Sequence, residues 1–352
     1  MTQKQHRLIQ SIDIDPPGSA TESMAGPYLP VEWLLSASYI ETLDLTGPML
    51  ILVIQDHFRV AFDDLGATEG GLVTVMFDDV MNEGMSIEHT VLERSFRIAT
   101  LEQNGHGLLQ LNCIESHIWE LMKPANKSRF FVNKPLSQAV EEMTGLTAKI
   151  SDDVVVSRCH LNAGDSVCTT LDRLALEQGC AIWLNRDNEL CMTRMATLAS
   201  ASPTIQFRHN DKDPSNQYPI KRYTLHQQGD LYQMRFCRNF GGWSQIDELG
   251  QILPETPPDL PYRYYPIDDP QVLTNLNWLM VPLLELDTRG VGELEPGEPA
   301  SLIAYRFEPH TPTNDRFPDF GITTKVVHYV SGEQAYLCRV ELGVPKDAVD
   351  TE

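Results

Sequence analysis

The chain has 352 residues, long enough for two or three domains whose hydrophobic cores need no disulfides. Its seven cysteines are an odd number without short framework spacing, which favours reduced thiols over a secreted disulfide scaffold. The formal net charge of −22 disfavours stable nucleic-acid binding, because such binding depends on basic residues that displace counterions from phosphate.

The N-terminal residues 1–30 are predicted to form an extended arm, because they contain the Pro-, Gly- and Ser-rich stretch DPPGSATESMAGPYLP. The first 15 residues lack the apolar core of a signal peptide. The longest apolar runs, such as MLILVI at 49–54, fall far short of the ~20 residues of a membrane-spanning helix. We therefore expect a soluble protein without stable membrane binding.

Residues 31–115 carry mostly strand signals. SYIETLDL and MLILVIQD flank the turn Thr46-Gly47-Pro48, and GGLVTVMFDD reads as a further short strand. LERSFRIATLEQ and LLQLNCIES face each other across residues 104–107, whose glycines suit the positive φ of a hairpin turn. The pattern predicts a closed or nearly closed antiparallel sheet.

The pattern changes to a mixed α+β module between residues 116 and 202. HIWELMK predicts a short helix, and NKPLSQAVEEMTGL a second one that begins near Pro135 and ends at Gly145. A third helix, SVCTTLDRLALEQ, is predicted to be capped by Asp165 and to end at Gly179. CAIWLN and ELCMTR follow as a hairpin that turns at residues 186–188.

Strand signals return over residues 203–345. A strand pair is predicted around Gly229-Asp230, and a C-terminal hairpin around residues 331–333. Between them lies a proline-rich and helical excursion at about 241–300, in which DPQVLTNLNWLMVPLLELDT predicts a helix broken at Pro282. Residues 241–352 hold 7 Lys and Arg against 19 Asp and Glu, a net charge of −12, and residues 346–352 are predicted to form a flexible acidic tail.

The stretch SRCHLNAGDSVC, residues 157–168, is the densest group of chemically reactive side chains. A zinc site would need closely spaced Cys or His hooks, whereas Cys159, Cys168, Cys180 and Cys191 are nine, twelve and eleven residues apart. Gly-Asp-Ser at 164–166 is similar to the serine motif of lipase-like esterases, but no Asp-x-x-His partner occurs. A helix cap at Asp165 is the favoured interpretation.

The other candidate sites also favour a structural interpretation over a catalytic one. Asp56-His57 follows a strand without a paired nucleophile and reads as a surface loop pair, and no hydrolase, metalloprotease or phosphate-loop motif is present. A basic and aromatic set could form a single-strand stacking platform, although aromatics on alternating strands more often face a core. Its members are Lys221, Arg222, Tyr223, Tyr232, Arg235, Phe236 and Arg238. We predict no catalytic, cofactor-binding or metal-binding residue.

Taken together, the sequence predicts a mainly β protein of the α+β class, with two β regions interrupted by a helix and hairpin module. The order of its pieces resembles the baseplate hub proteins of contractile-tailed phages, which are related to the hub portion of type VI secretion spikes. The resemblance spans about residues 31–345 and rests on the hairpin ending in SFRIATLEQNGHGLLQLNCIES, on KSRFFVNKPLSQAVEEMTGL, on GDSVCTTLDRLALEQGCAIWLNRDNELCMTR and on TTKVVHYVSGEQAYLCRVELGV.

The resemblance implies a non-enzymatic virion protein of the tail baseplate that assembles in the host cytoplasm and needs no cofactor. It implies two related antiparallel β-barrel tube domains, residues 31–115 and 203–345, with residues 116–202 as an insertion. Three chains would then form a pseudo-sixfold ring between the hexameric inner tube and the trimeric central spike. The implied partners are the tube or tube-initiator ring, the spike, wedge proteins and the tape-measure protein, with DNA only in transit.

Two alternatives of other classes remain. The abundance of Asp and Glu permits a tail-associated hydrolase that acts on cell-wall polymer through paired carboxylates. Aromatic residues such as Trp243 and Tyr262 to Tyr265 permit a non-catalytic carbohydrate-binding β protein.

Overall fold

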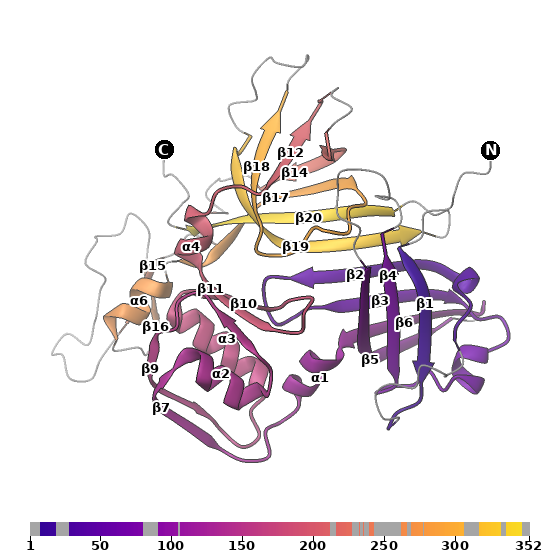
Figure 1. The fold of residues 1–352 in the computed structure, drawn as a ribbon, viewed down its shortest axis with the longest axis horizontal. Coiled ribbons are helices and arrows are strands. Elements are labelled where there is room, and N and C mark those ends of the chain that lie inside the picture. The colour runs from indigo at the N-terminus through magenta and orange to yellow at the C-terminus, as the bar shows by residue number, and fades with distance from the viewer. Residues whose placement is uncertain are drawn as a thin grey trace. The chain divides into compact units, whose positions relative to one another are not determined.

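The structure is a computed structural model of the full chain, drawn as a ribbon in Figure 1. It describes residues 8–18, 28–79, 91–104, 106–211, 216–226, 232, 235, 239–242, 262–265, 269–276, 278–305, 317–331 and 336–346. The chain divides into two compact units. Unit 1 comprises residues 1–123, 287–296 and 325–340, and unit 2 comprises residues 124–286, 297–324 and 341–352.

Unit 1 is built on a sheet whose strand order is β1-β4-β5-β6-β3-β2-β19, with every pairing antiparallel. In Figure 1, β1, β4 and β5 lie next to one another, as do β2 and β3. Their bounds are β1 Ile9–Asp15, β2 Leu34–Thr42, β3 Met49–Gln55, β4 Leu72–Asp78, β5 Val91–Gln103 and β6 Leu108–Glu115. A 3-10 turn, Val31–Trp33, precedes β2, a π-helical turn, Val60–Asp64, follows β3, and the helix α1, Ser116–Met122, follows β6.

One face of this sheet is the core of unit 1. Inward positions alternate along β3, where Leu50, Leu52 and Ile54 are fully buried, and this period of two is what a half-buried antiparallel strand requires. The predicted strand pairs and the β5–β6 hairpin are confirmed, and Gly107 in its turn has φ of 71°. Part of the predicted arm is β1, whose Ile12 and Ile14 also face the core.

Unit 2 begins with residues 124–202 of the module predicted at 116–202, whose first helix, α1, lies in unit 1. Two antiparallel strands, β7 and β9, form a ribbon, and β10, β11 and β8 form a second small sheet. The strand bounds are β7 Arg129–Pro135, β8 Ala148–Ile150, β9 Val155–Leu161, β10 Cys180–Leu184 and β11 Leu190–Arg194. The helices are α2 Leu136–Thr144, α3 Val167–Gln178 and α4 Met195–Ser200.

Glycine ends both longer helices of this module, as predicted. Gly145 after α2 and Gly179 after α3 are left-handed, with φ of 75° and 65°, a conformation that glycine adopts without steric cost. The cap at the start of α3 is different from the prediction. Ser166 is the N-cap residue and its hydroxyl accepts from the Thr169 N–H, whereas the Asp165 carboxylate accepts from the Asn162 side chain.

The rest of unit 2 is a second β region. Its pairings run β19-β18-β12-β13, with β12 parallel to both neighbours; β20 pairs with β19 and β17, and β17 pairs with β14. The bounds are β12 Ile205–His209, β13 Tyr218–Ile220, β14 Arg222–Leu225, β15 Asn239–Gly242, β16 Tyr262–Tyr265, β17 Met280–Arg289, β18 Pro299–Ala304, β19 Phe320–Ser331 and β20 Tyr336–Pro345. Strands β17, β19 and β20 have residues in both units.

The helix predicted from DPQVLTNLNWLMVPLLELDT is wrong over most of its length. Only α6, Pro270–Leu276, is helical, and the apolar residues after it belong to β17. Burial in β17 largely alternates, and Pro282 interrupts any helix because it lacks an N–H donor. An apolar run of this length fits a helix or a strand equally well. Its secondary structure therefore depends on whether strands distant in the sequence pair with it.

The protein is thus mainly β with mostly antiparallel sheets. Among the described strand pairings none closes a sheet into a barrel, so the expected closed sheet is not found within these residues. No helix in the described part of the chain is long and apolar enough to cross a membrane. The predicted turns at 229–230 and 331–333, most of the proline-rich section at 254–270, and all but the first residue of the acidic tail lie outside the described residues.

Candidate functional site

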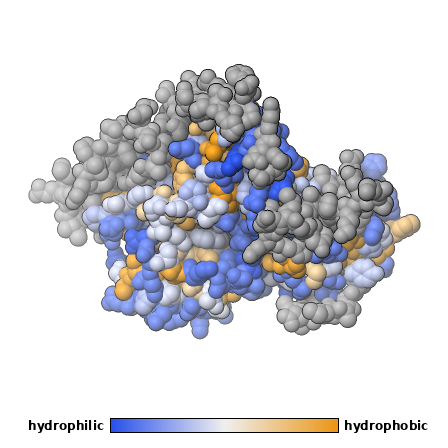
Figure 2. Space-filling view, turned by 45° about the horizontal axis from the view of Figure 1, so that its top comes forward, coloured by the Kyte–Doolittle hydropathy of each residue, from blue (hydrophilic) through white to orange (hydrophobic). Residues whose placement is uncertain are grey.

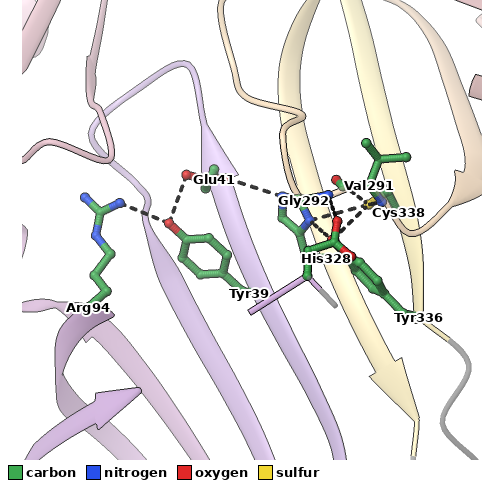
Figure 3. Close-up of polar contacts among 9 residues, drawn as sticks. Tyr39, Glu41, Arg94, Val291, Gly292, His328, Tyr336 and Cys338 are labelled. Carbon is green, nitrogen blue, oxygen red and sulfur yellow. Dashed lines mark hydrogen bonds and ion pairs between the residues drawn. The ribbon is translucent and has the colours of Figure 1, made fainter. Parts of the chain in front are cut away.

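The most concentrated group of polar side chains in unit 1 is a buried network on four strands (Figure 3). Tyr39 and Glu41 are two residues apart on β2, so both side chains point to the same face of the sheet. His328 on β19 is the register partner of Tyr39, and the two rings stack with centroids 5.8 Å apart. Arg94 of β5 and Cys338 of β20 extend the network at its two ends.

The network is a continuous chain of short contacts. Arg94 Nη1 donates to Tyr39 Oη at 3.0 Å, and the Tyr39 hydroxyl donates to Glu41 Oε1 at 2.9 Å. The other oxygen, Glu41 Oε2, lies 3.4 Å from His328 Nε2. On the far side of the imidazole, His328 Nδ1 lies 2.8 Å from the hydroxyl of Tyr336 and 3.4 Å from Cys338 Sγ.

Charge in the network is balanced internally. Burial by itself lowers the pKa of His328, but Cys338 and Glu41 outweigh burial and raise this pKa to about 9, so the imidazole is protonated at neutral pH. Burial also opposes the charge of Arg94, yet Tyr39 and the carboxylates of Glu115 and Glu41 raise its pKa. Buried charges are stable only when paired in this way.

A short segment of unit 1, residues 287–296, packs against the same network. The Val291 N–H donates to Cys338 Sγ at 3.3 Å, and the Gly292 N–H donates to Asp79 Oδ2 at 2.6 Å. Gly290 lies so close to Tyr336 that a Cβ at this position would be 2.1 Å from the ring. Only glycine fits there, so the segment and β20 are held in close contact.

A second charged pair lies where β6 meets α1. The carboxylate of Glu115 accepts from the backbone N–H groups of His117 and Ile118, which caps the helix, and it also lies 2.8 Å from His117 Nδ1. This hydrogen bond to Glu115 raises the pKa of His117 against the opposing effect of burial. Glu115 therefore stabilises the charge of Arg94 and also caps the N-terminus of α1.

The network is built to hold strands together. Its acid and base groups, Glu41 and His328, are only 3% and 2% exposed, so a substrate in solution has no access to either. Within the described residues no three His, Cys, Asp or Glu side chains are grouped as ligands for a metal ion. What the arrangement can do chemically is to fix the register of β2 against β19 and β20 through paired charges.

The residues singled out in the stretch 157–168 do not form a reactive site. Burial, assisted by Asp172, raises the pKa of Cys168 to about 12, and burial raises that of Cys180 to about 11. Both remain protonated thiols at neutral pH, whereas zinc ligation and nucleophilic attack need thiolates. The six described cysteines are all buried, and the Ser166 hydroxyl is engaged at the start of α3.

The Asp56-His57 interpretation is half wrong. His57 is exposed, as a surface loop pair requires, but the carboxylate of Asp56 is buried and has no hydrogen-bond partner among the described residues. The chain turns sharply after this pair, because Arg59 is left-handed with φ of 59°. The sequence pattern gave no sign of this burial, because Asp56 follows the last residue of a strand.

The described members of the basic and aromatic set do not form a stacking platform, and their aromatic rings pack inward, which is the alternative that the sequence favoured. Lys221 and Arg222 are exposed, but Tyr223 packs edge-on against His209 and Phe317, and Tyr232 is buried with its hydroxyl donating to the Pro282 carbonyl. Arg235 is exposed. Phe236, Arg238 and Trp243, with the side chains of Tyr262 to Tyr265, lie outside the described part.

Sequence reasoning missed the buried network altogether. A signal was present, because polar residues occupy inward positions of otherwise apolar strands in SYIET, VVHYV and YLCRV. Such an interruption of the period-two pattern indicates either a surface position or a buried partner. Strand pairing decides between them, and the pairing joins β2 near the N-terminus to β19 near the C-terminus.

Comparison with solved structures places this fold among tail proteins. A tail protein from Neisseria meningitidis MC58 matches with a TM-score of 0.62 and 11% identity, over 96% of each chain. The 43 kDa tail protein of prophage MuSo2 from Shewanella oneidensis matches with a TM-score of 0.60 and 12% identity, over 97% of this chain and 99% of that one. The fold is that of phage tail proteins.

The match extends to a secretion-system complex. A chain of the Francisella PdpA-VgrG complex in its half-lidded form aligns with a TM-score of 0.58 and 8% identity, over 99% of this chain but only 59% of that one. No protein-family model and no curated protein sequence matches the chain. At such low identity the likeness concerns the fold, and it agrees with the resemblance to baseplate hub proteins inferred from the sequence.

Proposed function

We propose that the protein is a structural hub of a contractile phage tail, located in the virion baseplate. The observation that carries the proposal is the match of nearly the whole chain to nearly the whole of two tail proteins. A match over one module alone would leave the role of the remainder open. A match over nearly the full length of both chains supports the same architectural role.

In the proposed assembly three chains form a ring. The β regions at residues 31–115 and 203–345 act as two related tube domains, so that three copies present six similar lobes to the hexameric inner tube. The opposite face binds the trimeric central spike, and wedge proteins surround the ring. The alignment with a chain of a complex that contains VgrG supports a spike-like partner. Closed rotational symmetry is how most homo-oligomers avoid open-ended growth.

The proposed role is mechanical, without catalysis or cofactor. In the described part of the chain, the buried network of unit 1 and the protonated thiols of unit 2 offer no reactive group to solvent. The channel of the ring would pass the tape-measure protein and then DNA, and the excess of carboxylates would keep polyphosphate from sticking. Assembly would take place in the host cytoplasm.

The mass and shape of the purified protein test this proposal. Multi-angle light scattering should give three times the chain mass of 39.7 kDa, either alone or with the spike protein of the same tail. Negative-stain images should show a ring with an open centre. A strict monomer at high concentration that binds neither spike nor tube would refute the hub function.

A further inference from the structure

The outer face of the β7/β9 ribbon in unit 2 is unusually apolar for a solvent-facing surface. Phe130 and Val132 on β7 are 72% and 61% exposed, and Val155 at the start of β9 is 64% exposed. These are three of only eleven large apolar side chains exposed in the described part of the chain, and all three lie in a ribbon of 14 residues. Single exposed apolar residues need no explanation, but a group on one ribbon marks an interaction surface.

The inner face of the ribbon is already covered. Phe131, between the two exposed residues, is buried together with Cys159 and Leu161, because α2 packs against β7 and α3 against β9. No described helix or strand covers the outer face in this way. Buried and exposed side chains therefore alternate along β7, with one face packed and the other open. If the open face met only water, polar residues would be expected at positions 130 and 132.

The ribbon is also basic, and Arg158 is the basic residue on its outer face. Register pairing places His160 opposite Phe130, with the two rings stacked at 6.5 Å, and Arg158 opposite Val132. Strands β7 and β9 together contain Arg129, Lys134 and Arg158 and no Asp or Glu. Figure 2 shows small groups of hydrophobic residues among hydrophilic ones on the face of the molecule turned to the viewer.

Part of this charge is neutralised locally, but Arg158 is not. Lys134 contacts Glu142 at 2.6 Å, and the Arg129 guanidinium donates to the backbone carbonyl of Glu142. Arg158 is exposed beside Val132 and carries no ion pair among the described contacts. An apolar centre edged by an exposed arginine is the composition of a protein interface, in which aromatic residues and Arg are enriched.

We propose that this outer face binds a second copy of the chain and is a contact between subunits. Charge complementarity identifies the occupant. The ribbon is basic within a chain of net charge −22, so another copy presents mainly acidic surface to it. The contact rests on the proposed homotrimer, to which it adds a specific surface outside the two β regions. The apolar residues supply affinity, and Arg158 and its basic neighbours supply orientation.

Matched single substitutions test the contact. Phe130→Ser should raise the concentration at which the assembly dissociates by about tenfold or more, the effect expected for an anchor residue of an interface, in sedimentation equilibrium. Phe58→Ser is the control, because Phe58 is 84% exposed on unit 1 and should leave association unchanged. Both positions are exposed, so circular dichroism melting curves should match that of the wild type.

Photo-crosslinking locates the contact directly. With p-benzoylphenylalanine in place of Phe130, irradiation should join two chains, and mass spectrometry should identify the attached peptide as an acidic one. The same group in place of Phe58 should give no chain-to-chain product. Arg158→Glu should weaken the assembly at low salt, because it replaces an attraction to the acidic neighbour with a repulsion.

The outcomes distinguish failure of the proposed ribbon contact from failure of the proposed homotrimer. A stable trimer that is unaffected by Phe130→Ser and gives no crosslink from position 130 overturns the contact and leaves the hub proposal standing. A dimer that Phe130→Ser dissociates keeps the contact and refutes the trimer. A monomer refutes both, and if heparin then retains the wild type but not Arg158→Glu, the surface belongs to an anionic polymer instead.

Discussion

At the scale of single residues, His328 joins the two charged ends of the unit 1 network. Its imidazole lies between Glu41 on one side and Tyr336 with Cys338 on the other, with every partner buried. A raised pKa of about 9 means that the folded protein holds a proton there which the unfolded chain, with a pKa near 6.5, releases earlier. Stability is therefore linked to the protonation of one side chain.

The sign of this linkage gives a prediction. The stabilisation from His328 should be fully present below about pH 6.5 and should be lost as the pH rises through about 9. Urea unfolding at a series of pH values should show the loss for the wild type and a flatter profile for His328→Gln, which should also be less stable by about 3 kcal/mol because Glu41 loses its cationic partner.

The control for this experiment is His117→Gln. His117 also has a raised pKa, but it is partly exposed, so its removal should change the pH profile much less. If His328→Gln keeps the same decline in stability between pH 6.5 and 9 as the wild type, the proton is not held on this imidazole.

At the scale of elements, two neighbouring residues, Asp165 and Ser166, are candidates for the N-cap of α3. The Ser166 hydroxyl accepts from the Thr169 N–H at 3.1 Å, whereas the Asp165 carboxylate accepts only from the Asn162 side chain among the described contacts. Ser166→Ala should therefore destabilise unit 2 by about 1 kcal/mol and speed amide exchange at Thr169, measured by hydrogen exchange. Asp165→Asn should cost about half as much or less, through the helix dipole alone. The reverse order would restore Asp165 as the cap.

The elements also show which features are predictable from sequence. Helix ends at Gly145 and Gly179 and the hairpin turn at Gly107 were predicted, because their signals are local and depend on glycine's access to positive φ. The short length of α6 and the start of β17 were not, since pairing with β14 and β20 decides the state of that apolar run. The unit 1 network was missed for the same reason.

At the scale of the whole molecule, charge is the property that most constrains partners. A net charge of −22 with a pI near 4.8 means that the surface repels phosphate at neutral pH, apart from local basic groups such as the β7/β9 ribbon. Proteins that bind DNA release counterions, and their affinity falls steeply as salt rises. A channel component needs the opposite behaviour, because DNA must pass it without being held.

We therefore predict that the protein does not retain DNA at neutral pH. Fluorescence anisotropy of a labelled duplex should show no binding at about 200 mM salt, and at most weak binding at about 50 mM salt that Arg158→Glu removes, since the ribbon is a concentrated source of positive charge. The proposed trimer, alone or with its proposed spike partner, should behave in the same way. Binding that persists at the higher salt, with only a shallow salt dependence, would indicate a dedicated nucleic-acid site and would contradict a passive conduit.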